Sequence, residues 1–131
     1  MGGWGTGSFE NDDAQDFLGQ LRSLGIDDLK QILARAADER NYLEAPESSV
    51  AIAAAEAIAG LKGAPSNHVP REMADWISAT RSGATANLNE LARRAVSKIR
   101  SNSELKDLWL EAEGLNEWSA SLRDLEKRLA D

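Results

Sequence analysis

The sequence predicts an all-α protein in which about seven helices form a single domain over residues 1–131. Apolar residues recur with a period near 3.6 in each regular segment, which is typical of helices with one buried face. No segment shows the alternation of apolar and polar residues, rich in β-branched types, that a half-buried strand requires. A single domain of this length buries about two-thirds of its unfolded surface, which is enough for one core.

The first ten residues are predicted to form a glycine-rich strap that packs across the helices. Trp4 and Phe9 are interspersed with glycines there, and a merely disordered terminus would need neither aromatic side chain. Glycine tolerates tight bends and close backbone contacts. We therefore expect Trp4 and Phe9 to enter the core while the glycines shape the path of the strap.

Seven apolar stripes of helical period follow the strap. They cover approximately residues 11–21, 27–41, 46–61, 70–77, 85–100, 104–112 and 116–129. The third stripe is rich in alanine, whose small side chain lets neighbouring helices approach closely. We therefore expect the third helix to be the central one.

Polar and helix-breaking residues mark the ends of the first three helices. Asn11 or Asp12 begins the first helix, because both side chains accept hydrogen bonds from free backbone N–H groups. Gly25 interrupts the chain before the second helix, and Pro46 suits the first turn of the third.

Similar signals separate the last four helices. Pro70 opens the fourth helix and Gly83 ends it. Ser101 and Glu104 have the spacing of a capping box before the sixth helix, which Gly114 ends.

Composition excludes several classes of protein. The chain has no cysteine, and hence no disulfide, thiolate metal site or cysteine nucleophile. The N-terminus lacks the basic and apolar regions of a secretory signal. The best candidate for a membrane span, residues 50–61, contains Glu56 and is shorter than the roughly twenty residues needed. We therefore expect a cytoplasmic protein without a membrane span.

The net charge of −7 is concentrated in the first half of the chain. Residues 1–60 hold eleven acidic and four basic residues, whereas residues 61–131 hold eleven of each. An acidic half disfavours binding to nucleic acid or to anionic membranes and would attract a basic protein partner. The alternative is a solvated acidic surface that aids solubility.

Acidic residues at the start of the first helix are candidate metal ligands. Asp12 and Asp16 share a helix face, and hard cations prefer carboxylate oxygen. The spacing of a calcium loop is absent, however, and helix capping accounts for Asn11 and Asp12. A single histidine, His68, gives little basis for a zinc site. We therefore predict no metal and no cofactor.

Glu56 interrupts the otherwise apolar third helix and has two interpretations. It is either a buried acid that pairs with an arginine, such as Arg93 or Arg94, or a glutamate that faces solvent. No histidine, cysteine or second carboxylate forms an evident catalytic group with it, so a catalytic role has no support.

The chain also resembles a known family. Its opening reads Met1-Gly2-x-Trp4-Gly5-x-Gly7-x-Phe9-x-Asn11-Asp12-x-Ala14-x-Asp16. Later segments are Ala53-Ala54-Ala55-Glu56, Leu61-x-Gly63 with Pro65, Ser103-Glu104-Leu105-x-x-Leu108-Trp109, and Trp118 before Asp124-Leu125-x-x-x-Leu129. Together they are similar to the bacterial family catalogued as domain of unknown function 4259. The resemblance implies a small helical domain and no established activity.

These observations favour a non-enzymatic binding or interaction protein whose acidic first half meets a basic partner. The alternative is a small ligand-binding protein or hydrolase that uses carboxylates near the strap. The candidate binding residues are Trp4, Asn11, Asp12, Asp16 and Glu56. A cleft that contains Glu56 together with Asp12 and Asp16 would favour the alternative.

The first prediction concerns Trp4. If its side chain is buried, Trp4→Ala leaves a cavity and lowers the free energy of unfolding by about 3–5 kcal/mol, with Trp4→Phe between the two. Urea unfolding of the three proteins measures the difference. An unchanged midpoint for Trp4→Ala would show that the side chain is exposed.

Overall fold

The computed structural model describes residues 5–38, 42–80 and 85–130. These residues form seven α-helices, one short 3₁₀ helix and no β-strand, which confirms the all-α prediction. The helices are α1 (Asp12–Gln20), η1 (Leu21–Ser23), α2 (Ile26–Asp38), α3 (Ala45–Lys62), α4 (Arg71–Ala79), α5 (Ala86–Ser101), α6 (Glu104–Glu111) and α7 (Leu115–Ala130). Trp4 lies outside the described residues.

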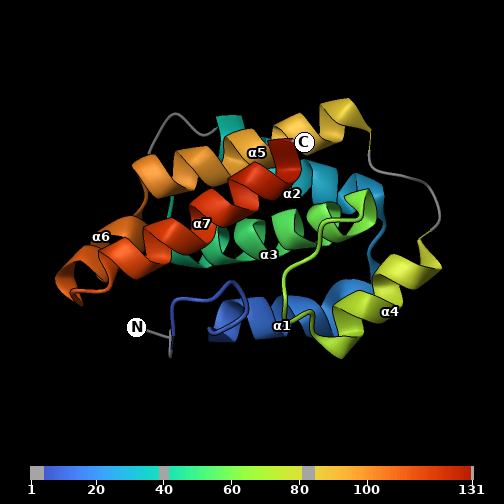
Figure 1. The fold of residues 1–131 in the computed structure, drawn as a ribbon, viewed down its shortest axis with the longest axis horizontal. Coiled ribbons are helices and arrows are strands. Elements are labelled where there is room, and N and C mark those ends of the chain that lie inside the picture. Colours follow the sequence, from blue (N-terminus) through green and yellow to red (C-terminus); the bar gives the residue numbers. More distant parts are fainter. Residues whose placement is uncertain (1–4, 39–41, 81–84, 131) are drawn as a thin grey trace.

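Helix α3 is the centre of the fold, as its alanines predicted. Every residue from 51 to 60 is buried. In Figure 1, α1 and α4 lie on one side of α3, whereas α2, α5 and α7 lie on the other. Small side chains along α3 let both groups pack closely, so α3 is covered on all sides although it is not itself amphipathic.

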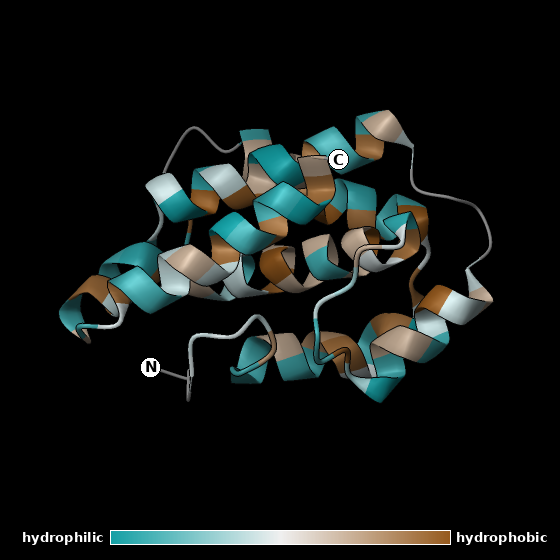
Figure 2. Cartoon of the chain, viewed as in Figure 1, coloured by the Kyte–Doolittle hydropathy of each residue, from teal (hydrophilic) through white to brown (hydrophobic). Residues whose placement is uncertain are grey.

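The outer helices each bury one face against this centre. Brown and teal bands alternate along α1, α5 and α7 in Figure 2, as expected of helices with one apolar stripe. The largest fully buried side chains come mainly from these stripes and include Leu18, Leu33, Ile99 and Leu122. The predicted strap contributes Phe9, which packs against the buried core.

The N-terminus of α6 docks on the N-terminus of α3. Glu104 N donates to Leu43 O at 2.8 Å, and Ala45 N donates to Glu104 Oε1 at 2.8 Å. An isolated parallel β-bridge joins Leu43 to Ser103 at the same place. We refer to these contacts as the α3–α6 clamp, because they join segments about sixty residues apart in the sequence.

The clamp corrects one prediction from the sequence. Ser103, and not Ser101, caps α6, because its hydroxyl accepts from Lys106 N at 3.1 Å. Glu104 bonds Ala45 instead of completing a capping box. The spacing from Ser101 to Glu104 matches that of a capping box. The Glu104 carboxylate instead accepts a hydrogen bond from Ala45 N, which is a tertiary contact.

Helix α6 ends in a Schellman motif. Gly114 N donates to Trp109 O at 2.9 Å, and Glu113 N donates to Leu110 O at 3.2 Å. The left-handed position is occupied by Glu113, with φ of 61°, rather than by the predicted Gly114. Glycine is needed at 114 for space: an added Cβ would lie 2.6 Å from Trp109 Cε3.

The second prediction follows from this contact. Gly114→Ala should lower the free energy of unfolding by about 1–3 kcal/mol, because the rigid indole of Trp109 cannot make room without repacking. The matched control is Gly19→Ala. No atom lies within 4 Å of its added Cβ, so it should stabilise α1 by about 0.5–1 kcal/mol. Urea unfolding measures both; equal midpoints for the two variants would contradict the contact.

Candidate functional site

Glu56 is a buried acid with an arginine partner, which is one of the two alternatives given by the sequence. Its side chain is 4% exposed and receives Arg128 Nη1 at 2.9 Å and Nη2 at 3.3 Å. Ser8 Oγ donates to Glu56 Oε2 at 2.6 Å. Glu56 therefore joins α3, α7 and the segment of Ser8 in one polar network.

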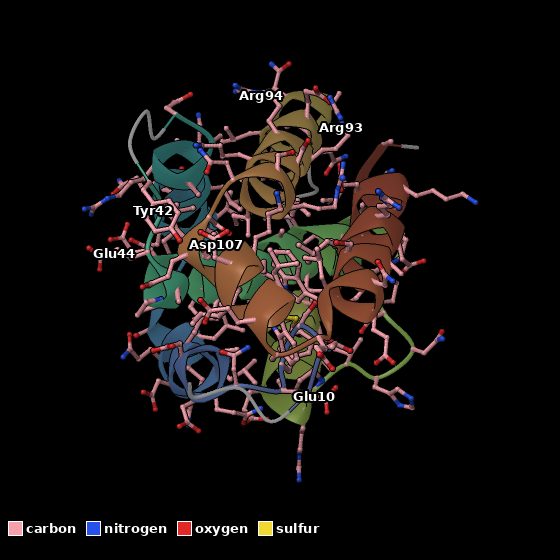
Figure 3. All side chains as sticks on the ribbon, turned by 90° about the vertical axis from the view of Figure 1, so that its left-hand side faces the viewer. Glu10, Tyr42, Glu44, Arg93, Arg94 and Asp107 are labelled. Carbon is pink, nitrogen blue, oxygen red and sulfur yellow. The ribbon has the colours of Figure 1, made fainter. Side chains whose placement is uncertain are left out.

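The arginines suggested from the sequence are not the partners. Arg93 pairs with Glu90 one turn away on α5, and Arg94 Nη1 lies 3.8 Å from Asp38 Oδ1 on α2. Figure 3 shows Arg93 and Arg94 on the outward side of α5. Both arginines lie on α5, whereas Arg128, the partner of Glu56, lies on α7.

Arg128 uses its guanidinium donors within the fold. Nε donates to Asp124 Oδ2 at 2.8 Å, and Nη1 also reaches Ala64 O at 3.2 Å. Burial acts to lower the pKa of Arg128, but hydrogen bonds and charge from Glu56 and Asp124 outweigh it, so the pKa is raised overall. The guanidinium therefore stays charged, and its hydrogen bonds are made to other groups of the same chain.

An open cleft of about 490 Å³ lies above this network. Its lining includes Ser8, Glu56, His68 and Arg128. His68 is exposed, as the sequence indicated for a loop histidine. Both oxygens of Glu56 are already hydrogen-bonded, and Arg128 donates four hydrogen bonds within the chain. The polar centre of the cleft thus has the features of a structural network rather than of a general base awaiting a substrate.

The remaining predicted residues do not join Glu56 in this cleft. Asn11 caps α1, since its Oδ1 accepts from Ala14 N at 2.8 Å. Asp12 and Asp16 are exposed on α1 and are absent from the lining of the cleft. Within the described ranges, no group of three or more histidine or acidic side chains could hold a metal ion.

A second surface feature surrounds Tyr42, just before α3. The ring is 49% exposed, and its hydroxyl donates to the carboxylate of Asp107 on α6. This hydrogen bond, with the nearby charges of Asp107, Glu104 and Glu111, raises the pKa of Tyr42 to about 12. Figure 3 shows Tyr42, Asp107 and Glu44 close together on one side of the molecule.

Leu110 adds an apolar side chain to this surface. It is 57% exposed and follows Asp107 by one helical turn, so both lie on the same side of α6. Tyr42 and Leu110 are the two large hydrophobic residues exposed within the described part of the chain. We call the surface formed by Tyr42, Glu44, Asp107, Leu110 and Glu111 the Tyr42 patch.

Sequence reasoning missed the Tyr42 patch because its members come from both halves of the chain. Residues 61–131 have no net charge, yet Asp107 and Glu111 lie on one face of α6. Their i, i+4 spacing around Leu110 was the available signal. The contribution of Tyr42 depends on the α3–α6 clamp, which no local pattern indicates.

Comparison with known families assigns the chain. A family model described as domain of unknown function (DUF4259) matches residues 2–121, so the chain belongs to this family. The resemblance stated from the sequence is thereby confirmed. Neither the curated proteins nor the solved structures give a match. Among the described helices, none combines the length and apolar character required to cross a bilayer.

The third prediction tests the buried ion pair. Arg128→Met leaves the Glu56 carboxylate buried without its cation and should lower the free energy of unfolding by about 3–5 kcal/mol. The double variant Glu56→Gln/Arg128→Met removes both charges and should recover a large part of that loss. Urea unfolding gives the double-mutant cycle.

The control is Arg93→Met, at a solvent-exposed pair with Glu90. It removes the same type of side chain and should change stability little, because exposed ion pairs are weak. A loss for Arg128→Met no larger than that of Arg93→Met would mean that the network is not structural.

Proposed function

We propose that the protein is a non-enzymatic interaction protein that binds a basic partner through the Tyr42 patch. The observation that carries this proposal is the position of the two exposed large hydrophobic residues. Tyr42 and Leu110 both lie among carboxylates, those of Glu44, Asp107 and Glu111. An apolar centre with a charged rim is the usual anatomy of a protein interface.

The chemistry of the patch favours a partner with arginine or lysine beside an apolar side chain. Tyrosine is enriched among residues that dominate binding energy, since it offers a large rigid surface and a polar end. The hydrogen bond to Asp107 fixes the ring before binding, which reduces the entropy lost on association. The acidic rim attracts a basic partner and repels nucleic acid.

The proposal modifies the expectation of an acidic N-terminal half. Asp12 and Asp16 are exposed, but they flank no exposed large hydrophobic residue within the described ranges. They supply long-range attraction, whereas the Tyr42 patch supplies the contact surface. A cytoplasmic location remains part of the proposal.

The alternative of a hydrolase has weaker support. The carboxylates that a hydrolase would use do not lie together in one cleft. Glu56 is bound by Arg128 and Ser8, and Asp12 and Asp16 lie outside the cleft that contains Glu56. Catalysis by a general base needs a carboxylate with a free oxygen near the substrate.

The fourth prediction uses a fluorescent peptide that contains arginines and leucines as the probe. Tyr42→Ala leaves the net charge unchanged and should weaken binding about tenfold or more. Glu44→Lys/Glu111→Lys should abolish binding at moderate salt. Fluorescence anisotropy measures the dissociation constants at two salt concentrations, which separates contact from diffuse attraction.

The matched control is Asp12→Lys/Asp16→Lys, which alters the net charge by the same amount on α1. This variant should weaken binding less than about threefold, because its charges act only at a distance. Equal losses for the two double variants would show that diffuse charge binds the peptide and that the Tyr42 patch is not the interface.

A further inference from the structure

An open hollow lies where α5, α6 and α7 meet. Figure 1 shows the last turns of α5, helix α6 and the first turns of α7 together at the left-hand end of the molecule. The hollow has a volume of about 510 Å³, and every residue of its lining belongs to one of these three helices. We refer to it as the basic hollow, for the residues described next.

Three cationic side chains line the basic hollow, and each comes from a different helix. Arg100 lies on α5, Lys106 on α6 and Arg123 on α7. Among the described residues, no acidic side chain belongs to the lining. The whole chain has a net charge of −7, so this gathering of cations is a local reversal of its charge. Positive charge in a concave surface attracts anions.

Arg123 carries a charge that no carboxylate of the described chain neutralises. The two nearest acids along α7 bind other arginines, since Asp124 Oδ2 accepts from Arg128 Nε at 2.8 Å and Glu126 Oε2 accepts from Arg100 Nε at 2.6 Å. None of the ion pairs within the described ranges includes Arg123. Because its side chain is also exposed, its guanidinium is open to an anion from solution.

Arg100 and Lys106 are held by contacts that leave some of their donors unused. Arg100 Nε and Nη2 donate to Glu126 at 2.6 and 3.3 Å, which raises the pKa of Arg100, while its Nη1 donates to no described group. Lys106 Nζ donates to Ser101 O at 3.1 Å, which takes one of its three N–H groups. Both cations are therefore positioned before a ligand binds, which lowers the entropy cost of binding.

The carboxyl end of α5 borders the basic hollow, and free carbonyl groups there would repel an anion. Most of that repulsion is removed by hydrogen bonds. Ser101 Oγ donates to Ser97 O at 2.8 Å, and Ser103 Oγ donates to Ile99 O at 2.7 Å. The ammonium group of Lys106 covers the carbonyl of Ser101. The cations thus determine the sign of the charge at this end of α5.

Helix α7 adds neutral donors and an apolar contact. Asn116, Ser119 and Arg123 follow the i, i+3, i+7 spacing of one helix face, and all three line the basic hollow. The Asn116 amide offers two N–H donors and the Ser119 hydroxyl offers one. Leu115 supplies an apolar side chain to the same wall.

We propose that the basic hollow binds the phosphate group of a small phosphate ester. A phosphate dianion has three terminal oxygens that accept hydrogen bonds from several directions, as the donors of three helices supply. A planar carboxylate, by contrast, is already satisfied by two parallel hydrogen bonds from one arginine. Arg123 forms such a pair with two phosphate oxygens, and Arg100 and Lys106 donate from the walls of α5 and α6.

The volume of the basic hollow is larger than a phosphate ion requires. Sites for small molecules typically measure roughly 300–1,000 Å³ and combine apolar walls with a few polar groups. The organic part of the ester therefore has room beside Leu115. This site is independent of the proposed protein interface, because none of its lining residues belongs to the Tyr42 patch.

The binding experiment uses inorganic phosphate, phenyl phosphate and acetate with the whole protein at constant ionic strength. In isothermal titration calorimetry both phosphate compounds should bind saturably, and phenyl phosphate should bind about threefold more tightly or better, because its ring contacts Leu115. Acetate should bind about tenfold more weakly than inorganic phosphate or worse, since it has one charge and two oxygens. Phosphate should shift the NMR amide resonances of Ser119 and Arg123 and leave that of Asp12, on α1, in place.

Variants of Arg123 test the contribution of its guanidinium. Arg123→Gln should weaken phosphate binding about tenfold or more, and Arg123→Lys, which keeps the charge without the paired donors, should fall between. The matched control is Arg71→Gln, which changes the net charge by the same amount on α4, away from the basic hollow (Figure 1). It should weaken binding less than about twofold, because its charge acts only at a distance.

Four results would overturn the proposal. The first is no saturable binding of either phosphate compound. The second is an equal loss of affinity in Arg123→Gln and Arg71→Gln, or an equal amide shift at Asp12 and Ser119, since either would mean that diffuse charge binds the anion. The third is acetate bound as tightly as phosphate, which would make this a carboxylate site. The fourth is phenyl phosphate bound no more tightly than inorganic phosphate, which would show that the organic part is not held.

Discussion

The buried pair of Glu56 and Arg128 is the interaction on which the rest of the structure depends. Helix α3 is covered on all sides, so a carboxylate in its middle must be neutralised within the protein. Arg128 supplies the charge from the last turn of α7, and Ser8 supplies a hydrogen bond from the other end of the chain. The Glu56 side chain thus fixes the last helix and residues near the N-terminus against the central helix. The planar guanidinium of Arg128 also bonds Asp124 and Ala64 O.

The sequence was sufficient for the fold class and for most helices because those follow from local patterns. Alanine content identified α3 as central, and residue type limited the cap of α1 to Asn11 or Asp12, of which Asn11 is the cap. The partner of Glu56 was not predictable in the same way. Arg93 and Arg128 are equivalent by type, and only the packing of α7 beside α3 selects Arg128. The cap of α6 was predicted at the wrong serine for a related reason. The Glu104 carboxylate accepts a hydrogen bond from Ala45 N, 59 residues earlier in the sequence.

The candidate functional surfaces were less predictable still. Charge counted along the chain pointed to the first sixty residues, but the Tyr42 patch combines Glu44 with Asp107 and Glu111 from the neutral half. Charge in a folded protein is concentrated by geometry as much as by composition.

The α3–α6 clamp has a consequence for the lifetime of the protein in a cell. The clamp holds the segment of Tyr42 against α6, where Tyr42 bonds Asp107, so the Tyr42 patch exists in the folded chain and not in the unfolded one. A partner that recognises this patch therefore withdraws protein from the pool that proteases can attack. At a partner concentration of about a hundred times the dissociation constant, this linkage adds roughly 2.7 kcal/mol to stability. Abundance of the protein would then follow abundance of its partner.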